Sequence, residues 1–503
     1  MPDIAAPALA LIPILIILVL MVGFHRSAAL AAGVGLAAAV GIAFAAFGAD
    51  GAILTGVAAE AGFTALTILW IVFAALCLHE LQTATGAVAT LRGALTRLSA
   101  DRRVLAILVA WFFALFIEGA AGFGTPAALA APMLVSVGFT PMQAVTLALI
   151  GHAPGVSFGA VGTPVLPQIA ATDFGPVPLA AAVATLHGAL GWIVMVFLMR
   201  QAGDGTLDGV ALRRAGLAAA LFLLPYLAIA MLVGPELPTL GGALVGGLVF
   251  VWWLRRAGAV PAVSASVGTE PAAGGGPGLL RAGLPYLVIL ALILLTRLSP
   301  ELKAAARSVE IAWTLPGGFS GSFQPLYHPG TMLLAGLLIG GAAQGAGANG
   351  LLAAMGRAAR RLPMVAVALV AMLGLARLMV ATGMIPALAE AAAAGLGPVW
   401  PLLAPWVGIL GSFVTGSATA SNILFTDFQE ATAAALSLPA LPLLGAQNFG
   451  AAVGNMICPH NVIAACAVVG LAGREGEVLR RTILPCAVYA LAGGALTWAI
   501  LAL

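Results

Sequence analysis

One carboxylate stands alone in a very apolar part of the chain, within FIEGAAGFGTP from Phe116 to Pro126. Its neighbours are glycines and a proline, which interrupt helices. Burial away from water favours the neutral form of a carboxyl group, so Glu118 is a candidate for proton exchange. The plainer alternative is an acid that caps a helix near the lipid headgroups. We expect Glu118 to carry the proton at a membrane-buried site.

Three other stretches also interrupt apolar runs with small and polar residues: GHAPGVSFGAVGTP (151–164), TGSATASN (415–422) and QNFGAAVGNMICPHN (447–461). Non-helical backbone at membrane depth occurs only where protein or a water-filled cavity satisfies it. A helix that restarts there offers free N–H groups and the positive end of its dipole. Four such ends around one point would bind a small anion, most simply a carboxylate. The alternative is that the small residues only let helices pack closely.

Two basic side chains are further candidates. Arg377 lies inside a span, where its guanidinium could hold a substrate carboxylate with two hydrogen bonds. It could instead pair with Glu118 or Asp427, or reach the outer surface. His152 precedes a break and is either a proton relay or a buried structural histidine. For His187, which lies within a span without a nearby motif, we expect a structural role.

The composition defines the class of protein that must position these residues. The chain has 503 residues, of which 62% are hydrophobic and 8% charged, too few charges for a soluble surface. Apolar runs of membrane-spanning length predict a polytopic all-α membrane protein and exclude a β-barrel. The net charge of +3 suggests no nucleic-acid partner. The four cysteines form no CxxC pair, so we expect no metal site, and we expect no cofactor.

Twelve spans are predicted, and the basic residues orient them. With both termini outside, most of the 21 basic residues fall in cytoplasmic loops. The first run is interpreted as a span because it lacks the basic start of a signal peptide. The predicted spans are 5–24, 28–47, 61–79, 141–170, 177–199, 215–233, 239–254, 283–297, 329–345, 364–382, 441–472 and 482–503.

The chain divides into halves that look like a repeat. A Gly- and Pro-rich segment, 257–280, is predicted to be a cytoplasmic flexible linker between residues 1–256 and 281–503. ELQTATG at Glu80 matches RLMVATG at Arg377, and later stretches match in the same order. The stretches 104–137 and 398–437 each begin and end on one side of the membrane, on opposite sides. These features predict an inverted repeat with two re-entrant hairpins, typical of secondary transporters.

The four broken stretches, in this order and spacing, resemble the L-lactate permease family across essentially the whole chain. The family implies proton-linked symport of L-lactate, and often glycolate, across the bacterial cytoplasmic (inner) membrane. It also implies kinship with hairpin-type, elevator-like ion transporters, many of them homodimers. Arg377 and His152 depart from the pattern, which leaves the identity of the short hydroxy- or keto-acid open.

The resemblance carries over to particular residues in the four breaks. Thr419 and Asn455, in the same breaks, complete the expected substrate-binding set together with Arg377. The residues that the resemblance supports are Glu118, Gly119, Gly122, Gly124, Thr125, Ser157, Gly159, Gly162, Thr163, Gly416, Ser417, Ser421, Asn422, Gly454 and Pro459.

The leading prediction is therefore a proton/monocarboxylate symporter, with a small carboxylate, a proton and the lipid bilayer as its partners. The main alternative is a sodium-coupled di- or other carboxylate carrier of the hairpin type, for which TGSATASN would supply oxygen ligands. A channel and a membrane-embedded enzyme are the remaining classes. The acids are scattered rather than clustered near an interface, which disfavours an enzyme.

Overall fold

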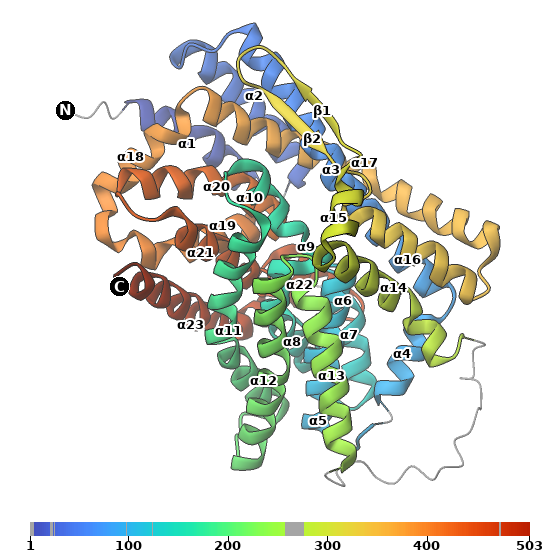
Figure 1. Ribbon diagram of the computed structural model, residues 1–503. Coiled ribbons are helices and arrows are strands. Elements are labelled where there is room, and N and C mark those ends of the chain that lie inside the picture. The colour runs from blue at the N-terminus through green and yellow to red at the C-terminus, as the bar shows by residue number, and fades with distance from the viewer. Residues whose placement is uncertain are drawn as a thin grey trace.

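Figure 1 shows the computed structural model of the chain, which describes residues 5–20, 24, 26–96, 98–122, 124–256, 276–471 and 474–502. Nearly all of these residues are helical, and one β-hairpin is the only sheet among them. Most of the expected linker, residues 257–275, lies outside the described residues.

The elements before the linker are all helical, and several begin at a capping side chain such as Asp50, Thr140 or Asp208. In chain order they are α1 (Ala5–Leu18), α2 (Ala28–Ala46), α3 (Gly51–Ala84), α4 (Ala87–Thr96), α5 (Arg102–Ala106), the π-helix η2 (Ile107–Phe113), α6 (Ala114–Ala120), α7 (Thr125–Ser136), α8 (Pro141–Gly151), the 3-10 helix η3 (Ala153–Phe158), α9 (Gly159–Gly162), the 3-10 helix η4 (Thr163–Val165), α10 (Leu166–Ala171), α11 (Pro176–Ala202), α12 (Gly209–Leu232) and α13 (Pro238–Arg256).

The elements after the linker include the unpredicted hairpin, in which Ile311 pairs with Phe323. This hairpin lies on α3, where Trp313 packs edge-on against Phe63. In chain order the elements are α14 (Leu279–Leu298), α15 (Pro300–Arg307), β1 (Ile311–Thr314), β2 (Ser320–Phe323), α16 (Pro329–Ala343), α17 (Gly347–Ala381), α18 (Met384–Leu396), the 3-10 helix η5 (Gly397–Val399), α19 (Trp400–Thr415), α20 (Ala418–Ala435), α21 (Ala440–Gly454), α22 (Pro459–Ala467) and α23 (Glu475–Ala502).

Membrane-spanning helices make up most of the structure. In the described part of the chain, 11 helices are long and apolar enough to cross a membrane, or 12 if a bent pair forms one span. All the predicted spans coincide with helices. Their lengths differ from expectation: α1 has 14 residues and α16 has 15, whereas α3 has 34 and α17 has 35. Length alone would also allow 102–120 and 384–415 to cross.

The same order of elements occurs on both sides of the linker. A long helix ends at a left-handed glycine and a shorter helix follows, as α3–Gly86–α4 (φ 74°) and α17–Gly383–α18 (φ 81°). A helical hairpin, an interrupted span and a long helix then follow in each half. The helices α12 and α13 have no counterpart after α23.

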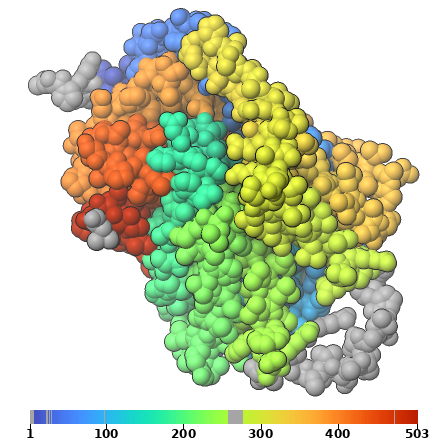
Figure 2. Space-filling view, viewed as in Figure 1, coloured from blue at the N-terminus to red at the C-terminus, as the bar shows by residue number. Residues whose placement is uncertain are grey.

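The halves interlock in space. In Figure 2, the green helices α11 to α13 lie between orange and red segments on one side and yellow segments on the other. Helix α11 packs against α21 and α23, and α3 packs along α17. In Figure 1, α6, α7, α9 and α22 gather near the centre, where α6 contacts α7 and α9, and α7 contacts α22.

Candidate functional site

The first hairpin is interrupted at residues 121–124, between α6 and α7. Gly122 (φ 58°) and Gly124 (φ 78°) adopt the left-handed conformation that glycine tolerates best. The Thr125 hydroxyl donates to the Gly122 carbonyl at 2.7 Å. Phe123 lies outside the described residues. Gly122 and Gly124 therefore supply the left-handed backbone on both sides of this position.

Glu118 lies in the last turn of α6 and is 4% exposed. A methyl group built on Gly159 would overlap Oε1 of Glu118, and one built on Gly122 would lie 3.4 Å from it. Among the described residues, no group forms a hydrogen bond or an ion pair with this carboxyl group. Two glycines thus make room for a carboxyl that no charged partner holds.

The first broken span runs from α8 to α10 and bends by 44°. Ala160, Val161 and Gly162 follow one another with φ angles of 44°, 55° and 84°. Left-handed backbone costs about 1–2 kcal/mol for each non-glycine residue, so the surroundings must hold this turn in place. A methyl group on Gly162 would lie 2.6 Å from the Pro235 carbonyl oxygen, so the α12–α13 loop packs directly on the turn.

Side chains from α12 and α13 satisfy the irregular backbone of η3. The Tyr226 hydroxyl donates to the Pro154 carbonyl at 3.0 Å, and the Thr239 hydroxyl donates to the Gly155 carbonyl at 2.7 Å. All of these groups are buried. We call Tyr226 and Thr239 the α12–α13 brace, because they supply the hydrogen bonds that the broken helix lacks.

A third polar contact reaches η3 from α11. The Ser157 hydroxyl lies 2.9 Å from Nε2 of His187, and Nδ1 of His187 lies 2.7 Å from the Tyr489 hydroxyl. Ser157 and His187 are fully buried. His187 is therefore hydrogen-bonded at both ring nitrogens inside the protein.

The second hairpin, α19 and α20, turns at residues 416–417. Gly416 has a φ of 78°, and Ser417 caps α20 by accepting a hydrogen bond from the Ala420 amide at 3.4 Å. Helices α19 and α20 pack against each other. Thr419, in the first turn of α20, is 5% exposed. This tip is therefore built from a glycine and a capped helix, with no carboxylate.

Amide side chains hold the second hairpin to α21. Nε2 of Gln447 donates to the Ser421 hydroxyl at 3.2 Å, and Nε2 of Gln429 donates to Oε1 of Gln447 at 3.2 Å. Nδ2 of Asn422 donates to the Pro164 carbonyl at 2.8 Å, in the first broken span. We call Gln429, Gln447, Ser421 and Asn422 the amide network. All four side chains are fully buried.

The second broken span is interrupted between α21 and α22. Nδ2 of Asn455 donates to the Ala451 carbonyl at 3.2 Å, and Nδ2 of Asn461 donates to Oδ1 of Asn455 at 2.6 Å. Cys458 precedes Pro459, the first residue of α22. An asparagine pair therefore bridges this break.

The four interruptions meet, and we call their meeting point the four-break junction: 121–124, 159–162, 416–417 and 455–461. Methyl groups built on Gly122, Gly124 and Gly416 would lie 3.2 Å from Ala160, 3.0 Å from Oδ1 of Asn461 and 3.3 Å from Cβ of His460, respectively. The first tip thus touches both broken spans, and the second tip touches the second broken span. Helices α7, α20 and α22 all begin at this junction.

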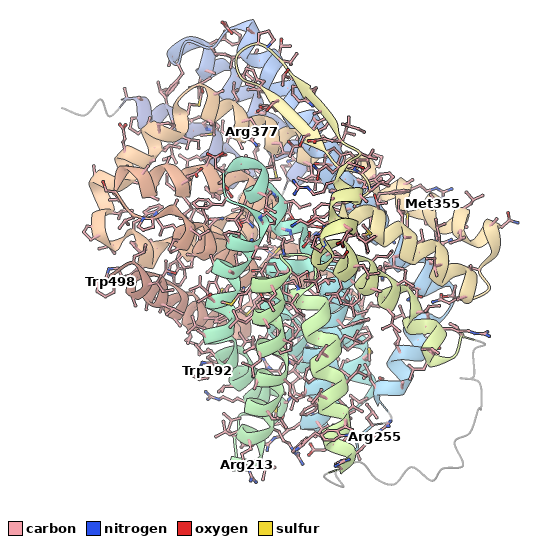
Figure 3. The ribbon with its side chains drawn as sticks, viewed as in Figure 1. Trp192, Arg213, Arg255, Met355, Arg377 and Trp498 are labelled. Carbon is pink, nitrogen blue, oxygen red and sulfur yellow. The ribbon has the colours of Figure 1, made fainter. Side chains whose placement is uncertain are left out.

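Two of the predicted site residues lie apart from the junction contacts. Nη2 of Arg377 donates to the Ala170 carbonyl at 2.6 Å, near the end of α10, and Arg377 interacts electrostatically with Asp427. In Figure 3, Arg377 lies far from Arg213 and Arg255, which mark the opposite end of the molecule. His152 ends α8, and its Nδ1 lies 2.6 Å from the Ala148 carbonyl oxygen.

Several predicted hydroxyl donors are already bonded within the protein. Thr125 and Thr163 donate to carbonyls three residues earlier, and Ser421 donates to the Gly408 carbonyl at 2.8 Å. With these hydroxyls engaged, the features that would favour an anion are the positive dipole ends of α7, α20 and α22, where some N–H groups are bonded, such as that of Ala420 to Ser417.

Three residues that support the junction were not predicted from the sequence: Tyr226, Thr239 and Gln429. Gln447 was predicted to lie in a break, but its hydrogen bonds to the second hairpin were not predicted. The signal was weak for the first two, because one hydroxyl in an apolar run often bonds within its own helix. Gln429 was a clearer signal, since an amide in an apolar segment needs a partner. Asn461 belonged to a predicted break, but only the contact with Gly124 shows its place.

Comparison with known proteins identifies the family of the chain. A model described as L-lactate permease matches residues 7–503. The chain belongs to the L-lactate permease family. It is 28% identical to the glycolate permease GlcA of Escherichia coli over 472 residues, covering 86% of this chain and 84% of that protein. It is 30% identical to an L-lactate permease of Streptococcus iniae over 383 residues, covering 74% and 78%.

The fold of this L-lactate permease family member has a structural relative. The crystal structure of the Alcanivorax borkumensis YdaH transporter, described as having an unusual topology, superposes with a TM-score of 0.51 at 17% identity. The superposition covers 87% of this chain and 86% of that one. The chain is thus a multi-pass membrane transporter of a bacterial permease family and not an enzyme.

Proposed function

We propose that this permease is a proton-coupled symporter of L-lactate and related short 2-hydroxymonocarboxylates such as glycolate. The observation that carries the proposal is Glu118: a buried carboxyl, without a charged partner among the described residues, that packs against the first broken span. The printed names of the relatives, lactate and glycolate permeases, support the substrate class.

The substrate carboxylate would bind at the four-break junction. The N-termini of α7, α20 and α22 lie there, so the positive ends of their dipoles would favour an anion. Protonation of Glu118 would remove a negative charge from the edge of this site, so that a proton and an anion are bound together. Substrate and proton would then cross as a neutral pair, which avoids the cost of moving a lone charge through lipid.

The proposed arrangement of the halves is an inverted repeat. The matching order of α3–Gly86–α4 and α17–Gly383–α18, and of the hairpins that follow, supports it. Hairpin 104–137 would then dip in from the cytoplasm and hairpin 398–437 from outside, with both termini outside. Arg377 would act on the outer side, where it bonds the end of α10, and not as a direct ligand of the substrate.

Uptake into proteoliposomes tests this proposal. Radiolabelled L-lactate should accumulate when the outside is made acidic, and an imposed sodium gradient at constant pH should not drive it. Glu118→Gln should abolish accumulation but retain exchange of internal for external lactate, because the neutral amide mimics the protonated state. Glu390→Gln, which alters an exposed carboxylate on α18, is the matched control. Sodium-driven uptake, or normal accumulation in Glu118→Gln, would contradict the proposal.

A further inference from the structure

His187 lies in a closed polar chain next to the first break. It is fully buried on α11, and Phe449 and Tyr226 pack around its ring at centroid distances of 4.7 and 6.1 Å. Its two nitrogens face the hydroxyls of Ser157 and Tyr489. No solvent is needed to satisfy the ring, since each nitrogen has one protein partner.

The direction of these hydrogen bonds follows from the last acceptor in the chain. The Ser157 hydroxyl also lies 3.4 Å from the backbone carbonyl oxygen of Asn448, which can only accept. Ser157 therefore donates to Asn448 and accepts from His187, so Nε2 carries the ring proton. Nδ1 must then accept from the Tyr489 hydroxyl. The opposite tautomer would leave the Tyr489 hydrogen without a partner among the described residues.

This series of hydrogen bonds connects η3 to two other helices. Tyr489 lies on α23 and Asn448 on α21, so the Ser157 hydroxyl is turned toward these helices. Gly159, which makes room for Glu118, is two residues further along the same turn. The hydrogen bonds of Ser157 therefore anchor η3 close to the backbone that faces the proposed carboxylate site.

We propose that His187, fixed as the Nε2–H tautomer by Tyr489, is a positioning residue that sets the orientation of Ser157 and the shape of the first break. The consequence for transport rests on the proposed function, because it assumes that this break binds the substrate carboxylate. Loss of the positioning bond should weaken substrate binding more than it slows turnover. His187 does not itself contact the substrate.

Histidine nitrogen-15 NMR of the purified protein tests the bond without any transport assay. The chain has 6 histidines, and a difference spectrum against His187→Gln assigns the ring. We expect a neutral ring with a protonated Nε2 and an unprotonated Nδ1. Tyr489→Phe should shift the Nδ1 signal, and Ser157→Ala should shift the Nε2 signal. An Nδ1–H tautomer, or His187 nitrogen signals that stay unchanged in both variants, would overturn the inference.

Lactate uptake tests the consequence. His187→Leu should raise KM about tenfold, the effect of one lost hydrogen bond, with a smaller change in maximal rate. His187→Gln should recover part of the affinity, because its amide N–H can still donate to Ser157. Thr185→Val, two residues away on α11, is the control. Unchanged KM in folded His187→Leu refutes the positioning role. If the wild type transports no lactate, the proposed function fails, while the NMR result still decides the bond.

Discussion

The first broken span (α8 to α10) and the second (α21 to α22) end at the same junction, but different elements hold them. The first depends on Tyr226 and Thr239, from helices that have no counterpart in the second half. The second is held partly within its own half, by the amide network and by the pair Asn455 and Asn461. It also bonds to the first broken span, because Gln168 accepts from the Asn448 side chain and donates to the Leu444 carbonyl. The strained, left-handed turn occurs in the braced span.

The two hairpin tips also differ in the residues that form them. Both tips contain left-handed glycine, but the first carries Glu118, whereas the second has Ser417 as a helix cap and neutral amides behind it. A carboxyl group that exchanges a proton needs surroundings that tolerate both its neutral and its charged form. Glycine has no side chain that could bond the carboxyl and hold it in one form. A rigid amide network suits a site that keeps one geometry. The proposed proton exchange therefore depends on the first half, whereas the proposed substrate site at the four-break junction draws on both halves.

The largest expected loss of stability comes from removing the ion pair at the α12–α13 loop, which packs on the first break. Nη2 of Arg297 lies 2.7 Å from Oε1 of Glu236, in the α12–α13 loop, and donates to the Tyr327 carbonyl at 3.0 Å. Arg297→Leu leaves the buried Glu236 carboxylate unpaired, which costs about 3–5 kcal/mol. Thermal unfolding in detergent measures this, and Arg297→Leu with Glu236→Leu should recover most of it. Equal stability of the single and double variants would argue that the pair supports nothing.

The next effect tests the contact that makes the first tip special. Gly159→Ala places a methyl group where Oε1 of Glu118 lies, and such overpacking costs about 1–3 kcal/mol. Lactate accumulation should fall at least tenfold, because the carboxyl is displaced. Gly41→Ala, at a helix position with open space around it, is the control. Normal accumulation in Gly159→Ala would show that the fit between residues 118 and 159 is unimportant.

A matched pair of substitutions compares the brace with the amide network. Gln447→Leu removes partners from both Ser421 and Gln429, whereas Thr239→Val removes one donor from the Gly155 carbonyl. An unsatisfied buried group costs about 1–3 kcal/mol, so the glutamine variant should unfold at the lower temperature. The comparison fails if Thr239→Val is the more destabilising of the two.

The smallest effect concerns the base of the first hairpin. Ion pairs join this base to the residues at the start of α12. Among the described residues of the second hairpin, 397–435, no ion pair occurs. The Ala211 amide and the Arg103 guanidinium hold the pKa of Asp208 below its usual 3.8. The resulting stabilisation is complete above that usual value and is lost as pH falls through the lower, folded-state pKa. Asp208→Asn should lower the melting temperature slightly at pH 7 and not at pH 2. A difference that persists at pH 2 would rule out this ionic origin.

Most of the fold could be predicted because the length of apolar runs reports directly on membrane spans. Glycine and proline also marked the interruptions correctly, as Gly122, Gly162 and Gly416 show. The turn at Ala160 and Val161 could not be predicted, since neither residue favours a left-handed backbone. The brace was equally hidden, because Tyr226 and Thr239 act across helices that lie far along the chain.

The close fit between Glu118 and Gly159 should couple these two positions in evolution. A methyl group on residue 159 and a full-length glutamate at residue 118 exclude each other, so neither position can change freely. Relatives that carry alanine at the position of Gly159 should carry aspartate or a smaller residue at the position of Glu118. An alignment of the family would reveal this as paired substitution, a record of steric fit preserved across species.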